Sequence, residues 1–513
     1  MRTVGLRQVA SGTLMLLALT NNGCGGDDDS ATGPDLEPST QFQTIELPAG
    51  YTIERVVAGL TFPTAIAWDD QGTLYVSEAG GGFVEEPFPS RILRVAGGQA
   101  TELVNLEARG VQDAVAGMVF HNGAFLITHR DADRSGAVSR VGLDGSVTKL
   151  LTGFLDSQSE HQLNDIRVGP DGLLYLTNGP AANSGVVGLD LAPFISRSPG
   201  VRTTPCQDIV LTGRNYETPD FRTPGPTDLV RTGAYMPFGT PSTAGQVIPG
   251  TNKCGGAIFQ FDPNNAEGTL RVFAHGFRNV LGIVWNSRGE MFGAVNGYDV
   301  RGSRPVNDEF DATYRVREGA WYGVPDYSAA LEPLTEAKFN PPDALQASVF
   351  IGDAMQPKAL GFVIDQAASG LAVPDQTLVV GLHEVNSSPS LLDAAPATWG
   401  EFADQLFVPE WGDLAPGTTP LRDGPAGFQV VRLTAGSTAP LPFLKNVSDG
   451  PASRQGATGM GIERPYAVRF GPDGAMYVVD WGIVNVNPEQ ENRPPYEFLP
   501  QTGAIWRVSP PAP

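Results

Sequence analysis

Phe62-Pro-Thr-Ala-Ile-Ala-Trp-Asp-Asp-Gln-Gly-Thr-Leu-Tyr-Val-Ser is a sequence pattern that recurs along the chain. It returns as Leu163-Asn-Asp-Ile-Arg-Val-Gly-Pro-Asp-Gly-Leu-Leu-Tyr-Leu-Thr and as Arg464-Pro-Tyr-Ala-Val-Arg-Phe-Gly-Pro-Asp-Gly-Ala-Met-Tyr-Val-Val. Each copy is an apolar run, a four-residue turn that contains Gly, and a second apolar run. Because Gly accepts the positive φ of tight hairpin turns, each copy predicts two antiparallel strands. Such hairpins at long spacing are typical of sheets stacked around an axis, a β-propeller.

Weaker copies of the pattern bring the number of predicted hairpins to six. Two begin at Gly117 and Leu281, and a third, with a longer turn, runs from Ala359 to Val380. Five-residue apolar or alternating runs are candidate outer strands, and they begin at Arg91, Ala137, Ala257, Phe428 and Ala504. Because 62 Gly and 43 Pro leave few helical windows, we predict an all-β fold, a six-bladed β-propeller.

Composition narrows the class of protein. At 513 residues and 41% apolar content the chain can bury a large core, and propellers of this size form one domain. Its formal net charge of −22 excludes a nucleic-acid partner, because phosphates require a basic face. The acidic surface is typical of a soluble, secreted protein.

The N-terminus has the features of a removable signal. Arg2 and Arg7 precede a short apolar stretch, Thr13-Leu-Met-Leu-Leu-Ala-Leu, which is too short to span a membrane and leads to Cys24. This resembles a bacterial lipoprotein signal, which implies lipidation of Cys24 in the bacterial cell envelope, with membrane attachment only through the lipid. The alternative is an ordinary signal peptide cut nearby. The predicted segments are a signal peptide at 1–24, a flexible tether at 25–42 and the propeller at 43–513.

The remaining cysteines flank a long insertion. Cys206 and Cys254 lie in an excursion of blade three from about residue 183 to 255. An oxidising compartment favours a disulfide between them, and closing so long a loop stabilises the fold by roughly 4 kcal/mol. Two unpaired thiols are the alternative.

Aligning the hairpins on their turn glycines brings polar residues to one level, just before the innermost strands. His161 and Arg278 each lie eleven residues before their turn glycine, and Gln112 does the same in blade two. Glu463 and Arg464 reach this level in blade six. Side chains at this position face the central opening, so these residues predict a polar site at one end of a funnel.

These motifs resemble a known enzyme family. Glu160-His-Gln-Leu-Asn-Asp-Ile-Arg and Gly276-Phe-Arg-Asn-Val-Leu-Gly-Ile look like the soluble quinoprotein glucose/sorbosone dehydrogenases, and the likeness runs from about residue 50 to 510. In that family a six-bladed propeller binds pyrroloquinoline quinone (PQQ) and Ca²⁺ and oxidises sugars. Further segments resemble its blade-two motif and its calcium loop, namely Gly110-Val-Gln-Asp, Asn296-Gly-Tyr, Asp308-Glu and Trp321-Tyr-Gly-Val-Pro.

The resemblance implies a catalytic set. His161 would be the general base that takes the hydroxyl proton while hydride leaves the carbon, with Glu160 orienting its ring. Arg278 would stabilise negative charge on the quinone oxygen, assisted by Ca²⁺. Gln112 would hydrogen-bond the sugar.

The resemblance also implies a binding set. Arg464 would pair with the cofactor's carboxylates, and Arg278, Asn279 and Asn296 would complete the cofactor site. Ca²⁺ prefers oxygen ligands, and the implied ligand residues are Gly297, Tyr298, Asp308 and Glu309.

The chain departs from the family in blades five and six. Gly381-Leu-His-Glu-Val stands where glucose-oxidising members carry a lysine, and Lys358 is the candidate substitute. Tyr466 replaces the second of two arginines in blade six. No aromatic residue that could cap the quinone is evident near Asp353. These departures remove contacts that the family uses for the cofactor, so they predict weaker PQQ binding.

Three functions are compatible with these residues. The first is oxidation of a sugar, polyol or sugar aldehyde, with electrons passing to a separate acceptor. The second is a non-catalytic envelope propeller that binds glycans or proteins. The third is a metal-dependent lactonase, for which the candidate metal ligands are Asn164, Asp165, Asn296 and Glu463.

Overall fold

The three strong copies of the repeat form the hairpins that the sequence predicts. β4 (Pro63–Trp68) pairs with β5 (Leu74–Glu78), β12 (Leu163–Val168) with β13 (Leu174–Asn178), and β30 (Pro465–Phe470) with β31 (Met476–Asp480). The turn glycines Gly72, Gly172 and Gly474 have φ of 75°, 79° and 77°. This is the left-handed region in which Gly has no steric penalty.

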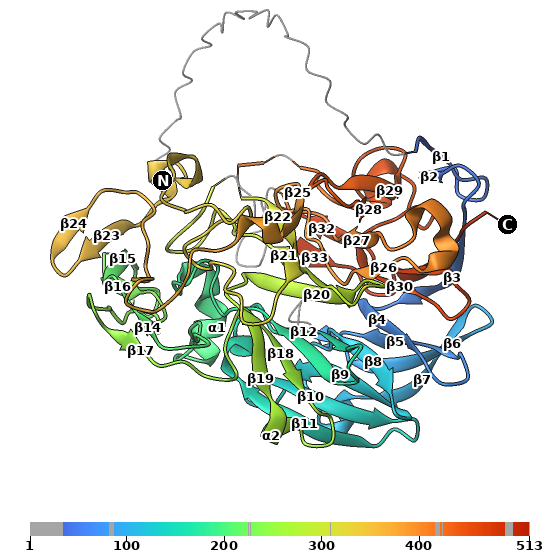
Figure 1. The fold of residues 1–513 in the computed structure, drawn as a ribbon, viewed down its shortest axis with the longest axis horizontal. Coiled ribbons are helices and arrows are strands. Elements are labelled where there is room, and N and C mark those ends of the chain that lie inside the picture. The colour runs from blue at the N-terminus through green and yellow to red at the C-terminus, as the bar shows by residue number, and fades with distance from the viewer. Residues whose placement is uncertain are drawn as a thin grey trace, which may run out of the picture. The chain divides into compact units, whose positions relative to one another are not determined.

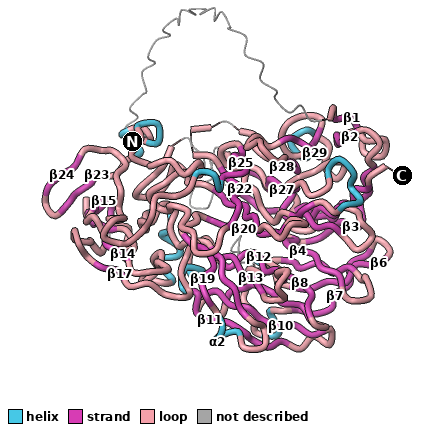
Figure 2. Tube along the Cα trace, viewed as in Figure 1, coloured by secondary structure: helices cyan, strands magenta, loops and turns pink. Residues whose placement is uncertain are grey.

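The computed structural model describes residues 34–81, 87–223, 225, 227–307, 309–415, 421–422, 424–487 and 496–511. The predicted signal peptide with Cys24, the first part of the predicted tether, and Asp308 lie outside the described residues. Strands and loops dominate, and the helices are short (Figure 2). None of the helices in these ranges is long and apolar enough to cross a membrane.

The sheets close into a ring of six blades. The innermost strands are β4, β8 (Met118–His121), β12, β20 (Asn279–Trp285), β26 (Asp393–Ala394) and β30. They contact one another in that order, and β30 in turn contacts β4. The described chain is therefore the all-β, six-bladed β-propeller that the repeats predict (Figure 1).

The outer strands complete each blade in chain order. Blade one adds β5, β6 (Arg91–Ala96) and β7 (Gln99–Asn105). Blade two adds β9 (Ala124–Arg130), β10 (Gly136–Gly142) and β11 (Val147–Phe154). Blade three adds β13, β18 (Ala257–Phe261) and β19 (Arg271–His275), with α2 (Ala266–Thr269) between the last two. Blade four adds β21 (Met291–Asn296), β22 (Asp311–Val316) and β25 (Val379–His383). Blade five adds β27 (Leu406–Glu410), β28 (Gln429–Leu433) and β29 (Leu441–Asn446).

Blade six combines both ends of the described chain. β3 (Thr52–Leu60) pairs with β34 (Gly503–Ser509), which pairs with β31, and a small hairpin of β32 (Val484–Val486) and β33 (Tyr496–Phe498) precedes β34. β1 (Leu36–Pro38) and β2 (Ile45–Pro48) extend blade five. Regular structure thus begins before the boundary predicted at residue 43, because β1 pairs with β2. Phe42 is also buried, with its ring centroid 5.0 Å from that of Trp506.

The predicted location of the blade-five hairpin, Ala359 to Val380, is wrong. β25 is the outermost strand of blade four, where it pairs with β22. Blade five begins at β26, and a 3₁₀ segment (Ala397–Phe402) lies in the connection to β27. This connection has no Gly-Pro-Asp-Gly turn, so the repeat could not reveal it.

Insertions from blades three and four join in one sheet. Between β13 and β18 the chain forms α1 (Ala192–Arg197), β14 (Ile209–Val210), β15 (Arg214–Pro219), β16 (Leu229–Gly233) and β17 (Val247–Ile248), and between β22 and β25 it forms β23 (Ser348–Ile351) and β24 (Ala354–Gln356). β15 pairs with β23, at the left of Figure 1. Cys206 and Cys254 form a disulfide, with 5.0 Å between their Cα atoms. The sequence predicts the first insertion but not the second.

Candidate functional site

Two adjoining hollows form one continuous cavity where the inner strands of blades three and four begin. They share five lining residues, His161, Asn279, Ser388, Trp411 and Leu414, and have empty volumes of about 510 and 780 Å³ that open to solvent. Loops after β21, β25 and β27 complete the walls. The lining combines charged and polar side chains, called the polar wall below, with aromatic rings, called the aromatic wall.

His161 lies two residues before β12, and its side chain is only 8% exposed. Its Nδ1 is 2.7 Å from the carbonyl oxygen of Pro180. A carbonyl can only accept, so we assign the proton to Nδ1 and a lone pair to Nε2. Nε2 lies 3.5 Å from Glu160 Oε1. Burial, followed by the positive charge of Arg278, lowers the pKa of His161 to about 4, which keeps the ring neutral at neutral pH.

Arg278, immediately before β20, faces an acidic partner. Its Nη2 is 2.8 Å from Asp299 and 3.0 Å from Asn183 Oδ1, and Asn386 donates to the other Asp299 oxygen at 2.7 Å. Burial alone would raise the pKa of Asp299, but the charges of Arg301 and Arg278 lower it. Arg278 Nε is buried and makes no hydrogen bond within the described chain.

Arg301 joins three carboxylates at the edge of the polar wall. It lies 2.6 Å from Glu160, 2.7 Å from Asp190 and 2.9 Å from Asp299. Asp190 belongs to the blade-three insertion, so this insertion contributes to the site. Although burial would raise the pKa of Glu160, the charge of Arg301 lowers it, which holds an anion beside the His161 ring.

The two asparagines of the implied cofactor set both line the cavity. Asn279 Oδ1 accepts a hydrogen bond from Asn164 at 3.0 Å. Asn296 Nδ2 donates to Ser388 Oγ at 2.9 Å, while its buried Oδ1 has no partner among the described residues.

The aromatic part of the lining contains a ring, Trp411, that the sequence analysis does not predict. Trp411 directly follows β27 of blade five and borders both hollows. Its ring centroid is 6.3 Å from that of Trp481, and Tyr466 lies 5.6 Å from Trp481. Tyr496 and Phe498 extend the wall. Aromatic rings and polar groups in one lining suit a ligand that has an apolar ring face and polar edges.

Arg464 is close to this wall but does not line the cavity. It is fully buried, with its guanidinium carbon 4.2 Å from the Trp411 ring centroid and 4.8 Å from that of Phe428. Its Nη1 donates to the Gly412 carbonyl at 3.1 Å, and burial lowers its pKa to about 9. The structure thus places Arg464 behind Trp411, where it supports the ring.

Two other predicted residues lie away from the cavity. Gln112 forms a backbone bridge with Arg130, and its side chain does not border either hollow. Lys358 lies in the blade-four insertion, where it is exposed and donates to the Asp343 carbonyl at 2.9 Å. Residues 359–364 are not the blade-five strand that the repeat indicates, so Lys358 lies in the blade-four insertion and not beside the cavity.

Three of the implied calcium residues surround a smaller neighbouring hollow of about 250 Å³. Gly297, Tyr298 and Glu309 line it, and the Tyr298 hydroxyl donates to the Tyr327 carbonyl at 3.0 Å. Glu309 accepts a hydrogen bond from the Ala329 amide, and burial raises its pKa well above its ordinary value. Within the described ranges, no three His, Cys, Asp or Glu side chains are grouped as a metal site.

The structure does not bring the four lactonase candidates together. Asn164 and Asn296 line different hollows. Asp165 forms a buried ion pair with Arg469 at 2.9 Å, and Glu463 accepts from Ser453 Oγ at 2.7 Å, so neither faces the cavity. A shared metal cage from these residues is not formed.

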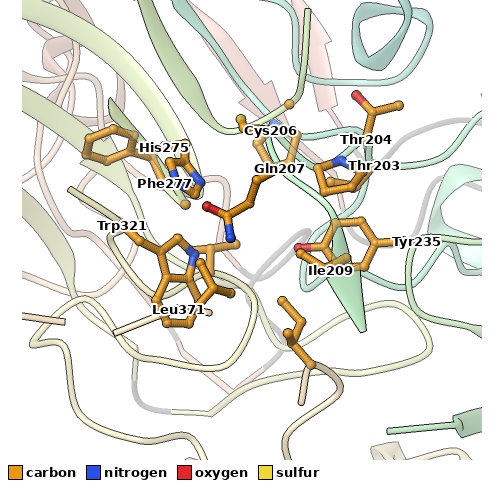
Figure 3. Close-up of a pocket in the computed structure, with 16 residues that line it drawn as sticks. Thr203, Thr204, Cys206, Gln207, Ile209, Tyr235, His275, Phe277, Trp321 and Leu371 are labelled. Carbon is orange, nitrogen blue, oxygen red and sulfur yellow. The ribbon is translucent and has the colours of Figure 1, made fainter. Parts of the chain in front are cut away.

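A further hollow of about 390 Å³ lies where the two insertions meet blades three and four (Figure 3). His275, Phe277 and Trp321 stand on one side of it, and Tyr235 and Ile209 stand on the other, with Gln207 between them. Phe277 directly precedes Arg278, and Pro180, which holds His161, also lines this hollow. The insertions therefore reach the residues that support the site.

Sequence reasoning missed much of the polar wall. Asp299 and Arg301 directly follow the Asn296-Gly-Tyr segment, so alternating charge after that strand was an available signal. Asp190 and Asn183 carried no such signal, because only the folded insertion brings them to Arg278 and Arg301.

The fold resembles those of solved PQQ-dependent sugar dehydrogenases. The holo PQQ domain of pyranose dehydrogenase from Coprinopsis cinerea is 16% identical with a TM-score of 0.51, and an iodide structure of the Trichoderma reesei family AA12 enzyme is 13% identical with a TM-score of 0.52. Each alignment covers 92% of this chain and 98% of that chain. The PQQ-bound aldose sugar dehydrogenase of Streptomyces coelicolor is 15% identical over 90% of this chain and 100% of that chain, with a TM-score of 0.45.

No protein-family model and no curated protein matches the chain. At 13–16% identity the structural likeness concerns the fold. At that level, the resemblance to the quinoprotein sugar dehydrogenases that the sequence motifs indicate is confirmed.

Proposed function

We propose that this protein is a PQQ- and Ca²⁺-dependent dehydrogenase that oxidises a sugar, polyol or sugar aldehyde and passes the electrons to a separate acceptor. The observation that carries the proposal is His161, a neutral imidazole with a free Nε2 on a cavity that also holds Arg278. A base and a guanidinium donor on one wall are the groups that hydride removal from an alcohol requires.

The lining suits the two cofactors in different ways. Trp411 offers an apolar ring face to a ring system. Arg278 and Asn296 both line the cavity, and each keeps one polar atom, Arg278 Nε and Asn296 Oδ1, without a partner among the described residues. The lining also holds more carboxylates than guanidinium groups: Glu160, Asp299, Asp311 and Asp413 against Arg278 and Arg301. A quinone that carries several carboxylates therefore needs a divalent cation in order to bind here.

The chain's own residues prepare the substrate. His161 Nε2 accepts the proton of the substrate hydroxyl, and Glu160, held by Arg301, stabilises the imidazolium that forms. Arg278, fixed by Asp299 and Asn183, places its positive charge beside the site of developing negative charge. The quinone, when bound, supplies the acceptor for the hydride.

Calorimetric titration with PQQ, in the presence and absence of Ca²⁺, tests the proposal. We expect micromolar or tighter binding with Ca²⁺, little binding without it, and at least tenfold weaker binding in Trp411→Ala. Trp321→Ala, a tryptophan in the separate hollow between the insertions, is the matched control and should bind as the unaltered protein does. A sugar panel with an artificial dye acceptor then identifies substrates.

Two results would contradict the proposal. Absence of PQQ binding in the presence of Ca²⁺ would exclude PQQ as the cofactor, and calcium-dependent binding without oxidation of any sugar or polyol would favour a non-catalytic envelope propeller.

We also propose a cell-envelope location with a lipid on Cys24. Cys24→Ala should release the protein from the membrane fraction, and its continued sedimentation with membranes would exclude the anchor.

A further inference from the structure

One peptide group connects His161 to a buried carboxylate. The Pro180 carbonyl accepts the hydrogen bond of His161 Nδ1 at 2.7 Å. The amide of the same peptide unit, Ala181 N–H, donates to Asp156 Oδ1 at 2.9 Å. Asp156, the Pro180–Ala181 peptide and His161 therefore form a continuous hydrogen-bonded chain that ends at the free Nε2 in the cavity.

Close packing fixes each link of this chain. A Cβ on Gly179 would stand 2.6 Å from His161 Cβ, so glycine is required for Pro180 to approach the ring. Gly255 similarly allows the backbone after Cys254 to lie against the Asp156 carboxylate. Asp156 itself is fully buried, in a 3₁₀ turn that follows blade two. The geometry is thus held by packing on both sides of the peptide.

The blade-three insertion supplies the other partners of Asp156. Thr204 donates its amide at 3.2 Å and also its hydroxyl, and every described hydrogen bond to Asp156 comes from an N–H or O–H donor. This set is what an ionised, acceptor-only carboxylate requires. Thr204 is fixed in turn, because its carbonyl accepts the Gly255 amide at 3.0 Å, one residue after the Cys254 disulfide.

We propose that Asp156 is a positioning residue for the catalytic base, acting through the Pro180–Ala181 peptide to hold His161 in the Nδ1–H tautomer. A carboxylate that accepts the hydrogen bond of the amide polarises the peptide and makes its carbonyl a stronger acceptor. The stronger carbonyl holds the proton on Nδ1, which leaves the Nε2 lone pair directed at the substrate. The inference rests on the proposed function of His161.

Neighbouring charges are compatible with this role. Glu160, Arg278 and Arg301 act on His161 from the polar wall, and Arg202 and Tyr235 are the charged or titratable groups that act on Asp156. Burial raises the pKa of Asp156 to about 7, so its charge is lost as the pH falls through neutrality. The support that it gives His161 should weaken over the same range.

Nitrogen NMR of the cofactor-free, full-length protein tests the tautomer directly. The chain has only 5 His, and His161→Gln assigns the signals of interest. In the unaltered protein at pH 7.5, we expect His161 to show the Nδ1–H pattern alone. Asp156→Asn keeps the shape but removes the charge, and it should give a measurable Nε2–H population.

A matched variant controls for general loosening. Asp326 is another fully buried aspartate that accepts backbone amides, from Val363 and Ile364, but it has no link to His161. Asp326→Asn should leave the His161 pattern unchanged. An unchanged His161 pattern in Asp156→Asn, or an equal change in Asp326→Asn, would overturn the proposal.

A second measurement needs no variant and covers the case in which Asp156→Asn does not fold. Labelling of proline carbonyl carbon and alanine nitrogen isolates the Pro–Ala peptides, including Pro180–Ala181. As Asp156 titrates, this signal and the His161 nitrogen signals should move together with one midpoint near pH 7. Independent movement would overturn the coupling.

Kinetics separate this inference from the proposed function. With PQQ, Ca²⁺ and an active sugar, Asp156→Asn should lower kcat about tenfold, the size of effect seen for partners that orient metal-bound histidines. KM should stay within about twofold, because Asp156 does not line the cavity. The NMR result stands whether or not the protein oxidises sugars. Sugar oxidation with an unaffected kcat and tautomer in Asp156→Asn would refute the positioning role alone.

Discussion

The Arg469 guanidinium lies 2.9 Å from the Asp165 carboxylate, although 304 residues separate them in the chain. Arg469 stands on β30 of blade six and Asp165 on β12 of blade three, which are opposite inner strands in the ring. Arg469 also donates to the Leu392 carbonyl of blade five at 2.9 Å. One side chain thus links three blades across the middle of the propeller.

We expect Asp165→Asn to destabilise the fold by roughly 3–5 kcal/mol, because it leaves the Arg469 charge buried without its partner. Urea unfolding measures the change. The exposed pair Arg507–Glu54 is the control, and Glu54→Ala should cost less than about 1 kcal/mol. Equal losses in the free energy of unfolding would show that the Asp165–Arg469 pair stabilises the fold no more than an exposed ion pair does.

His161→Gln should lower turnover by roughly 10²- to 10⁴-fold while PQQ binding and thermal stability stay close to those of the unaltered protein, because only the proton acceptor is removed. Steady-state kinetics, calorimetry and a melting curve measure the three properties. His121→Gln, at the end of β8 in blade two, should be fully active. Unchanged turnover in His161→Gln would exclude it as the base.

Glu463 should make stability depend on pH. Burial raises the pKa of Glu463 to about 7, so the folded protein keeps this proton to a higher pH than the unfolded chain does. The contribution of Glu463 to the free energy of unfolding therefore falls as the pH rises from about 4.5 to about 7. The free energy of unfolding of Glu463→Gln should rise, relative to the unaltered protein, by about 3 kcal/mol between pH 4.5 and 7.5.

Urea unfolding across this pH range measures the difference, with Glu54→Gln as an exposed control that should show little pH dependence. A difference for Glu463→Gln that is the same at both pH values would show that Glu463 ionises normally in the folded state.

Removal of the disulfide should cost about 4 kcal/mol of stability on the chain-entropy model, because Cys206 and Cys254 are 48 residues apart. The double substitution Cys206→Ser and Cys254→Ser should also lower kcat, since the disulfide holds the segments that bring Thr204 to Asp156. Urea unfolding and kinetics measure the two effects. Full activity in a destabilised variant would show that the insertion does not support the base.

Local signals in the sequence were sufficient for most of the fold. The glycine turns at residues 72, 172 and 474 and the apolar runs beside them specify hairpins, because turn geometry and side-chain alternation act over a few residues. The same signals placed His161 and Arg278 just before inner strands. They failed in blade five, where the connection from β26 to β27 has no tight turn.

Only the tertiary structure decided what surrounds those two residues. Asp299 and Arg301 meet Glu160 and Asp190 because neighbouring blades and an insertion converge, and no periodicity in the sequence encodes that meeting. The fold places Trp411 in the aromatic wall and places Arg464 behind the Trp411 ring, away from the cavity. The sequence by itself determined the repeated strands and the position of His161 just before one of them, since these depend on local geometry. The partners of His161 depend on contacts between distant segments, which exist only after the ring and its insertions have closed.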